Sequence, residues 1–202
     1  MFTLAGKSAR SASGPFALFG GGNTTVNVAV TDKYTYSGDT VSAGTNLGTA
    51  RRSLAAAGNS TQGIFGGGYD TAVTAVTDKY TYSGDTRVAG TALGTARRNL
   101  AAAGNSTQGV FGGGGTPFLT AVTDKYTYSS DTRVAGTALG TAREALAAAG
   151  NSTQGIFGGG NAAAVTAVTD KYTYSGDTRV AGTNLGTARN LLAASSSSPG
   201  GF

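Results

Sequence analysis

A segment of 46 residues is repeated along this chain, and this repetition constrains the fold more than any other feature. The motif Asp-Lys-Tyr-Thr-Tyr begins at four positions spaced 46 residues apart, Asp32, Asp78, Asp124 and Asp170. The phenylalanine before each glycine run keeps the same spacing, at Phe19, Phe65, Phe111 and Phe157. A fixed period of this length is typical of solenoids, propellers and other arrays, in which each copy forms one supersecondary unit.

The composition favours a folded repeat protein over a flexible chain. The 202 residues include 34 glycines and only 12% charged residues, which alone would suggest low complexity. However, the glycines recur at fixed places in the period, and there are only 3 prolines. The chain has no Cys and no His. This composition excludes thiol nucleophiles, histidine bases and the usual zinc sites, so we expect no metal site and no cofactor.

Each copy contains four short segments with the composition of strands. In the copy that begins at Arg97 they read LAAAG, GVFGG, VTDKYTY and TRVAG. In every copy a short turn joins the last two segments into a hairpin. The turn reads Ser-Gly-Asp at 83–85, and Ser130 replaces its Gly in the copy that begins at Arg97. The alanine segment favours a helix by propensity. It is short, however, and Gly104 begins a turn directly after it, so we expect a strand.

Four antiparallel strands in a unit of this length are typical of a propeller blade, so the predicted fold is all-β. The small alanines suit a crowded centre and favour a small β-propeller of about four blades. We predict a tail at 1–14 and one domain over 15–202. The predicted blades are 15–48 completed by 190–196, followed by 51–94, 97–140 and 143–186.

The C-terminal segment allows two assemblies. If the strand at 190–196 completes the first blade of its own chain, the ring closes and no sheet edge is exposed. If the same strand is inserted into a neighbouring subunit, strand addition builds a strand-swapped filament.

The order of the motifs resembles the kelch and galactose-oxidase-like repeats over nearly the whole chain. Arg97, the glycines at 112–114 and the Asp-Lys-Tyr at 124–126 follow in the order of a kelch unit, whereas the Trp and the His of that pattern are absent. The Gly/Ala/Thr-rich form is similar to repeats of phage structural and bacterial surface proteins, which implies a virion or adhesion role. The galactose-oxidase resemblance would imply copper held by His and a Cys-linked Tyr. The chain has neither residue, so we expect no enzyme.

The recurrent charges are expected to be structural. Buried charges require partners, so we expect ion pairs or hydrogen bonds between strands. The residues concerned are Asp32, Asp78, Asp124, Asp170, Arg51, Arg97, Arg143 and Arg189. A ring of these aspartates that binds a cation is an alternative, because oxygen ligands alone can hold calcium.

Seven residues after each glycine run vary most between copies, at 23–29, 69–75, 115–121 and 161–167. In repeat proteins such variation maps to loops on one face, which is where we expect ligands to bind. Neutral drift at a tolerant loop is the alternative explanation. The candidate ligand-binding residues are Tyr69, Asp70, Thr116, Phe118 and Asn161.

Eight of the nine tyrosines lie in the repeated motif. The first tyrosine of each motif is expected to pack in the core or between blades: Tyr34, Tyr80, Tyr126 and Tyr172. The second is close to the turn and is expected to be partly exposed: Tyr36, Tyr82, Tyr128 and Tyr174. A glycan could stack on Tyr69, Tyr82 or Phe118.

The predicted function is a non-enzymatic structural or interaction module of a virion or a surface adhesin. Its expected partners are other protein subunits or a host-surface glycan. The net charge of +5 is spread over the repeats, so nucleic-acid binding is not expected. There is no stretch of about 18 apolar residues and no apolar signal segment, so neither membrane insertion nor a secretory signal is expected. The localisation is left unassigned, and it is consistent with cytoplasmic synthesis and virion assembly. The alternatives are a multivalent lectin-like module, the filament subunit and an engineered repeat protein.

Overall fold

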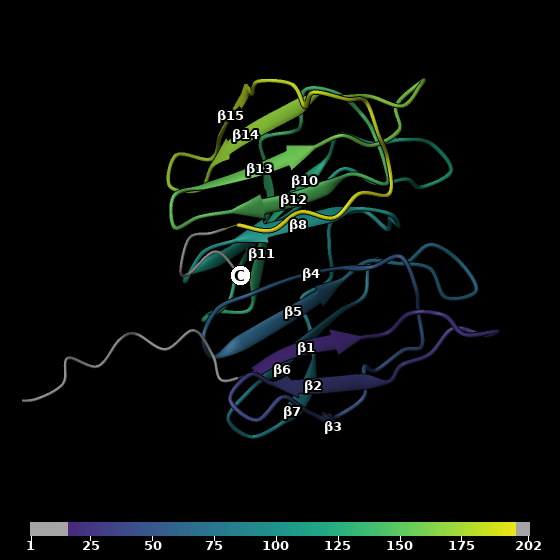
Figure 1. Ribbon diagram of the computed structural model, residues 1–202, viewed down its shortest axis with the longest axis vertical. Helices are drawn as coiled ribbons and strands as arrows, with labels where there is room; N and C mark the ends of the chain where they lie inside the picture. The colour runs from purple at the N-terminus through teal and green to yellow at the C-terminus, as the bar shows by residue number, and fades with distance from the viewer. Residues whose placement is uncertain (1–15, 197–202) are drawn as a thin grey trace, which may run out of the picture.

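The computed structural model of the protein describes residues 16–196 and contains fifteen strands and no helix in that range (Figure 1). The first sheet consists of β1 (Phe16–Gly20), β2 (Thr31–Thr35) and β3 (Thr40–Ala43). The second consists of β4 (Ala55–Gly58), β5 (Gln62–Gly66), β6 (Thr77–Thr81) and β7 (Thr86–Gly90). The third consists of β8 (Ala101–Gly104), β9 (Gln108–Gly112), β10 (Thr123–Thr127) and β11 (Thr132–Gly136). The fourth consists of β12 (Ala147–Gly150), β13 (Gln154–Gly158), β14 (Thr169–Thr173) and β15 (Thr178–Ala181).

The strands of each sheet pair antiparallel in chain order, and the register repeats from sheet to sheet. In the third sheet Phe111 lies opposite Ala102 on one side and opposite Asp124 on the other. Asp124 in turn lies opposite Ala135. Residues opposite one another project to the same face of a sheet, so each sheet places the same row of side chains on the same face. The predicted all-β class and the predicted strand in the alanine segment are confirmed.

The four sheets stack in chain order. In Figure 1 the first sheet lies at the lower end and the fourth at the upper end, and the strands β4, β8 and β12 that begin the later sheets follow one another upwards through the middle. We call the face of each sheet that packs on the preceding sheet its front and the opposite face its back. Phe111 projects from the front of the third sheet, and Val110 beside it projects from the back; both are fully buried. Neighbouring sheets therefore bury apolar side chains face to face.

Glycine on the back of one sheet makes room for the phenylalanine of the next. A Cβ built on Gly66 would lie 3.0 Å from the ring of Phe111, and one on Gly112 would lie 2.9 Å from the ring of Phe157. Close approach of the sheets at this point therefore requires a residue without a side chain.

The glycines that follow are needed for the backbone itself. Gly67 and Gly68 have φ values of +68° and +112°, in the region that favours glycine. The amide of Gly68 donates to the carbonyl oxygen of Arg97 at 2.9 Å. The glycine run thus turns the chain into the variable loop and joins it to the next copy.

The hairpin turn explains why Ser130 is accepted where the other copies have glycine. The residue with positive φ is the aspartate that follows, with values of 49° at Asp85 and 54° at Asp131. A Cβ built on Gly84 would make only ordinary contact, 3.5 Å from Thr86. The glycine position of this turn therefore tolerates a side chain.

The predicted closure of the ring by 190–196 is not present in the structure. This segment forms no strand, and within residues 16–196 the first sheet has three strands rather than four. The amide of Leu191 donates to the carbonyl oxygen of Ala145 at 2.8 Å, and the side chain of Leu192 covers Gly159. These contacts hold the segment on the fourth repeat. The predicted tail at 1–14 lies outside the described residues.

Candidate functional site

The arginine that opens each copy is buried and bound on several sides. Arg51 Nη1 lies 2.6 Å from Asp78 Oδ2. Its Nε donates to the carbonyl oxygen of Gly67 at 2.9 Å, and its Nη2 donates to that of Phe65 at 3.1 Å. Its Nη1 also donates to the carbonyl oxygen of Thr49 at 3.2 Å. The guanidinium thus lies in a slot made of one carboxylate and three carbonyl oxygens, which matches its fixed fork of donors.

The same ion pair recurs in the next two copies. Arg97 lies 2.7 Å from Asp124, and Arg143 lies 2.7 Å from Asp170. All three arginines are fully buried. Burial lowers the pKa of Arg97, whereas the nearby charge of Asp124 acts in the opposite direction. The carboxylate therefore supplies the countercharge that a buried guanidinium requires.

Each buried aspartate also binds a second arginine and the preceding repeat. Arg133 Nη1 lies 3.3 Å from Asp124 Oδ1, and the amide of Gly94 donates to the same oxygen at 3.1 Å. Arg87 and Arg179 make the equivalent contacts to Asp78 and Asp170. The sequence analysis missed these three arginines, although they are spaced 46 residues apart. Val41 occupies the equivalent position in the first copy.

The charges at the two ends of the array differ from the others. Asp32 is exposed, and within residues 16–196 it forms no ion pair. Arg189 is also exposed and, in the same range, is likewise without an ion pair. Of the eight charges expected to be structural, six are therefore joined in three buried pairs, and these two are not.

A second set of contacts between repeats was not predicted. The hydroxyl of Tyr126 donates to Asp131 Oδ1 in the following turn, and Tyr172 and Asp177 repeat this bond. Thr91 Oγ1 of the preceding repeat donates to the carbonyl oxygen of Asp131. The turn aspartate thus joins its own strand to the neighbouring repeat. The repetition of the Asp-Thr pair in all four copies was the available signal.

The variable segments project on one side of the molecule. β1, β5 and β13 all point to the right in Figure 1, so the segments that follow them emerge on that side. Each segment is closed by a bridge between its first and fifth residues, such as Tyr69 with Val73 and Asn161 with Val165. Phe118 is 81% exposed at the tip of its loop.

The candidate binding residues do not form a single site. The ring of Tyr69 contacts the guanidiniums of Arg52 and Arg98, whose Cζ atoms are 4.7 and 5.3 Å from its centroid. The contact of Asp70 is made by its backbone: its carbonyl oxygen accepts a hydrogen bond from Asn27 Nδ2 at 2.9 Å. Thr116 lies in the loop of Phe118, where its amide donates to the Phe118 carbonyl oxygen at 2.9 Å.

Asn161 is bridged through its backbone to Glu144. Glu144 in turn accepts a bond from Asn99 Nδ2 at 3.0 Å. Within the described residues, no hydrogen bond directly joins Tyr69, Thr116 and Asn161.

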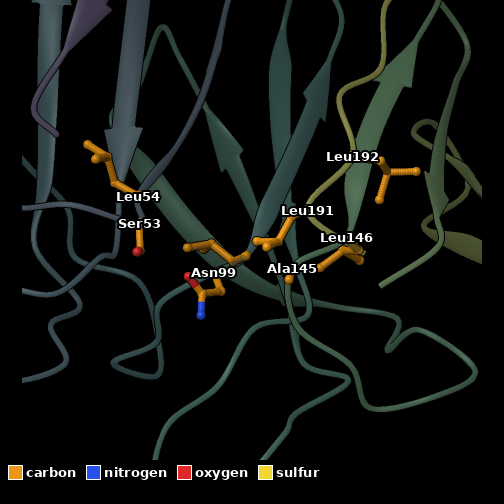
Figure 2. A pocket seen from close by; sticks show the side chains of 8 residues that line it. Ser53, Leu54, Asn99, Ala145, Leu146, Leu191 and Leu192 are labelled. Atoms are coloured by element: carbon orange, nitrogen blue, oxygen red, sulfur yellow. The ribbon is translucent and has the colours of Figure 1, made fainter. Parts of the chain in front are cut away.

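A shallow pocket lies where the inner segments of the second, third and fourth repeats meet the C-terminal segment at 191–192 (Figure 2). Its volume is about 260 Å³. The amide of Asn99 donates to the Ser53 carbonyl oxygen at 2.9 Å, and that of Ala145 donates to the Asn99 carbonyl oxygen at 2.8 Å. With the bond from Leu191 to Ala145, these form a continuous chain from repeat to repeat. The rim is lined by Ser53, Leu54, Asn99, Leu100, Ala145, Leu146, Leu191 and Leu192. The pocket thus has a mixed lining, in which leucine side chains alternate with the polar groups of Ser53 and Asn99.

The second tyrosines of the motifs are less exposed than predicted. Tyr36 is exposed, but Tyr128 and Tyr174 are 1% exposed. The prediction was wrong for these two because the neighbouring repeat covers them. Tyr128 lies in one buried cluster with Ala57 of the preceding repeat, and Tyr174 lies in another with Ala103 of the repeat before it. Tyr82 is half-buried, and Phe16 packs edge-on against its ring with centroids 5.3 Å apart.

Alkaline pH should destabilise the protein through these tyrosines. Burial raises the pKa of Tyr82 to about 12, and it raises the pKa of Tyr128 and Tyr174 further. Since these folded-state values exceed the unfolded value of about 10, the stability they contribute is fully present below pH 10. It is lost as the pH rises towards the folded-state pKa values. Tyrosinate absorbance should therefore include a late phase that coincides with unfolding, and Tyr128→Phe should reduce it. A single early phase for all tyrosines would contradict this expectation.

Neither a known family model nor a curated protein matches the chain. In the described range, no three His, Cys, Asp or Glu side chains lie close enough together to hold a metal ion. Over the same range, no helix has the length and apolar character needed to cross a membrane.

Proposed function

We propose that the protein is a non-enzymatic structural and interaction module, built as a small propeller of kelch-like blades, that presents its variable loops to another macromolecule. One observation carries this proposal: six of the eight recurrent charges are buried in ion pairs, while the variable segments share one side of the molecule. The guanidinium of Arg97 and the carboxylate of Asp124 are buried against each other and are not accessible to a substrate. A constant scaffold with varied loops is the usual design of a binding surface.

The loops differ in chemistry at equivalent places. The second loop presents Tyr69 in contact with two arginines, and the third presents the exposed ring of Phe118. Exposed aromatic rings are common anchors of protein interfaces. The resemblance to repeats of virion and surface proteins favours a virion component or an adhesin, with other protein subunits or a host-surface glycan as partners.

A multivalent carbohydrate-binding module is the second candidate, and the exposed ring of Phe118 favours it. A sugar can stack on this ring, whereas the ring of Tyr69 already contacts two guanidiniums. Repeated weak sites on one side of the molecule would add their affinities through avidity.

Exchange of the loops tests this proposal. Residues 69–75 and 115–121 should each be replaced by the sequence of 161–167, which already folds on the same scaffold. We expect an unchanged melting temperature and the loss of binding to glycan arrays or to immobilised partner subunits. Val134→Thr on the outer strand β11 is the matched control and should bind like the original protein. Binding that survives the exchange of both loops would exclude them as the recognition surface.

A further inference from the structure

The front of the first sheet contains an unfilled copy of the arginine slot. In the second sheet Arg51 binds the carbonyl oxygens of Phe65 and Gly67 and the carboxylate of Asp78. The residues equivalent to these three partners in the first repeat border a cavity of about 370 Å³. They are Phe19, Gly21 and Asp32. The residue 46 positions before Arg51 is Ala5, which has no guanidinium.

The apolar part of the same front is also uncovered. Phe19 is 62% exposed, whereas the equivalent Phe111 and Phe157 are fully buried against the preceding sheet. Val41, which stands where the later copies have arginine, is exposed as well. The first sheet therefore presents a complete docking surface with no sheet on it within the described residues.

The back of the fourth sheet has the complementary features. Ile156 is 40% exposed, whereas Ile64 and Val110 at the equivalent position are fully buried by the following sheet. A Cβ on Gly140 would clash with the Arg179 guanidinium of the next repeat, but one on Gly186 would meet no atom within 4 Å.

Arg189 lies beside this back face and supplies the missing charge. It is exposed, and among the residues described it forms no ion pair. Its carbonyl oxygen accepts from the Gly160 amide at 2.9 Å, as the carbonyl oxygen of Arg97 does from Gly68. The backbone of Arg189 is therefore placed as that of the arginines in the internal repeats. What it lacks is a following sheet whose aspartate would pair with its guanidinium.

We propose that a second copy of this chain docks the front of its first sheet on the back of the fourth sheet, with Arg189 in the slot of the second copy's Asp32. This inference rests on the proposed structural role and names its partner. The charges are complementary, and the contact repeats a junction that the chain already builds three times. Within one chain the two surfaces lie at opposite ends of the stack (Figure 1). Closure within the chain would have to change the existing junctions, whereas docking of a second copy changes none of them.

The same docking would supply the fourth strand of the first sheet. Residues 193–196 align with β8 in the repeat, and Ala194 corresponds to Ala102. Because Ala102 lies opposite Phe111, Ala194 would come opposite Phe19 of the second copy. Strand addition of this kind contributes main-chain hydrogen bonds at the free edge of β1. The contact joins two different surfaces, so assembly should continue beyond the dimer.

Light scattering over a concentration series tests the proposal with the full chain. The average mass should rise above the single-chain value of 19.8 kDa as the concentration increases, without a plateau at two copies. Arg189→Asp and Asp32→Arg should each abolish the rise, because each places like charges in the slot. Both positions are exposed, so circular dichroism should show an unchanged fold.

Mixing the two variants separates assembly between chains from closure within one chain. In the mixture every junction regains one arginine and one aspartate, so the mass should rise again at equal concentrations of the two variants. A mass of 19.8 kDa for the original protein at all concentrations would overturn the proposal. Single variants that assemble normally, or a mixture that stays at the mass of one chain, would also overturn it. None of these results affects the loop exchange, so the proposed binding function stands or fails separately.

Discussion

Replacing Asp124 by alanine should lower the free energy of unfolding by about 3–5 kcal/mol, because it leaves a buried charge without its partner. The carboxylate lies 2.7 Å from Arg97, which is fully buried, and it also accepts the amide of Gly94. Removing it leaves the buried Arg97 guanidinium without a countercharge, bonded to the carbonyl oxygen of Phe111, and leaves the Gly94 amide unbonded. Urea denaturation monitored by circular dichroism measures the loss.

The repeat supplies a matched control for this variant. Asp32 occupies the same place in the motif but is exposed, and in residues 16–196 it has no arginine partner. At concentrations where the chain is monomeric, Asp32→Ala should change the free energy of unfolding by no more than about 0.5 kcal/mol. Equal effects at the two positions would show that burial of the ion pair is not what stabilises the fold.

Phe111→Ala should have a loss of similar size, about 3–5 kcal/mol, because the substitution leaves a cavity between two sheets. The ring is fully buried and packs directly on Gly66 of the preceding sheet. Phe19→Ala removes the same ring from an exposed position and should cost far less. Thermal or urea unfolding of the two variants gives the comparison.

A double-mutant cycle locates this effect at the junction. Gly66→Ala alone should destabilise the protein, because its Cβ would lie 3.0 Å from the Phe111 ring. Combined with Phe111→Ala, the added methyl group enters the space that the ring has left. The double variant should therefore lose less stability than the sum of the single variants, since contacting residues are not additive. Strict additivity would mean that the two residues do not share a contact.

The strands were predictable because each strand segment recurs in several copies and is followed each time by the same turn residues. Ala101–Gly104 illustrates this: its alanines favour a helix, but Gly104 ends the segment after one short strand. Serine in place of glycine at 130 was compatible with the turn because Asp131 carries the positive φ.

Contacts between copies could not be predicted in the same way. The burial of Tyr128 depends on the adjoining repeat, and a single copy of the sequence does not reveal what its neighbour covers. The position of 190–196 has the same origin, because Leu191 and Leu192 contact Ala145 and Gly159 of the fourth repeat. The second arginine that contacts each buried aspartate recurs every 46 residues, so the sequence showed that it is there. Recognising Arg133 as a partner of Asp124 required the register that places their strands side by side.

The uniform junctions give this chain the thermodynamics of a one-dimensional lattice. Each sheet contributes an intrinsic free energy, and each junction contributes a coupling energy between neighbours. The second and third sheets have two couplings, whereas the first and fourth have one within the described residues. Local unfolding should therefore begin at the first and fourth sheets and proceed to the inner ones. In a hydrogen-exchange experiment, the amide protons of β9 should exchange more slowly than those of β1. Cooperativity in such a molecule is a property of the number of copies rather than of any one of them.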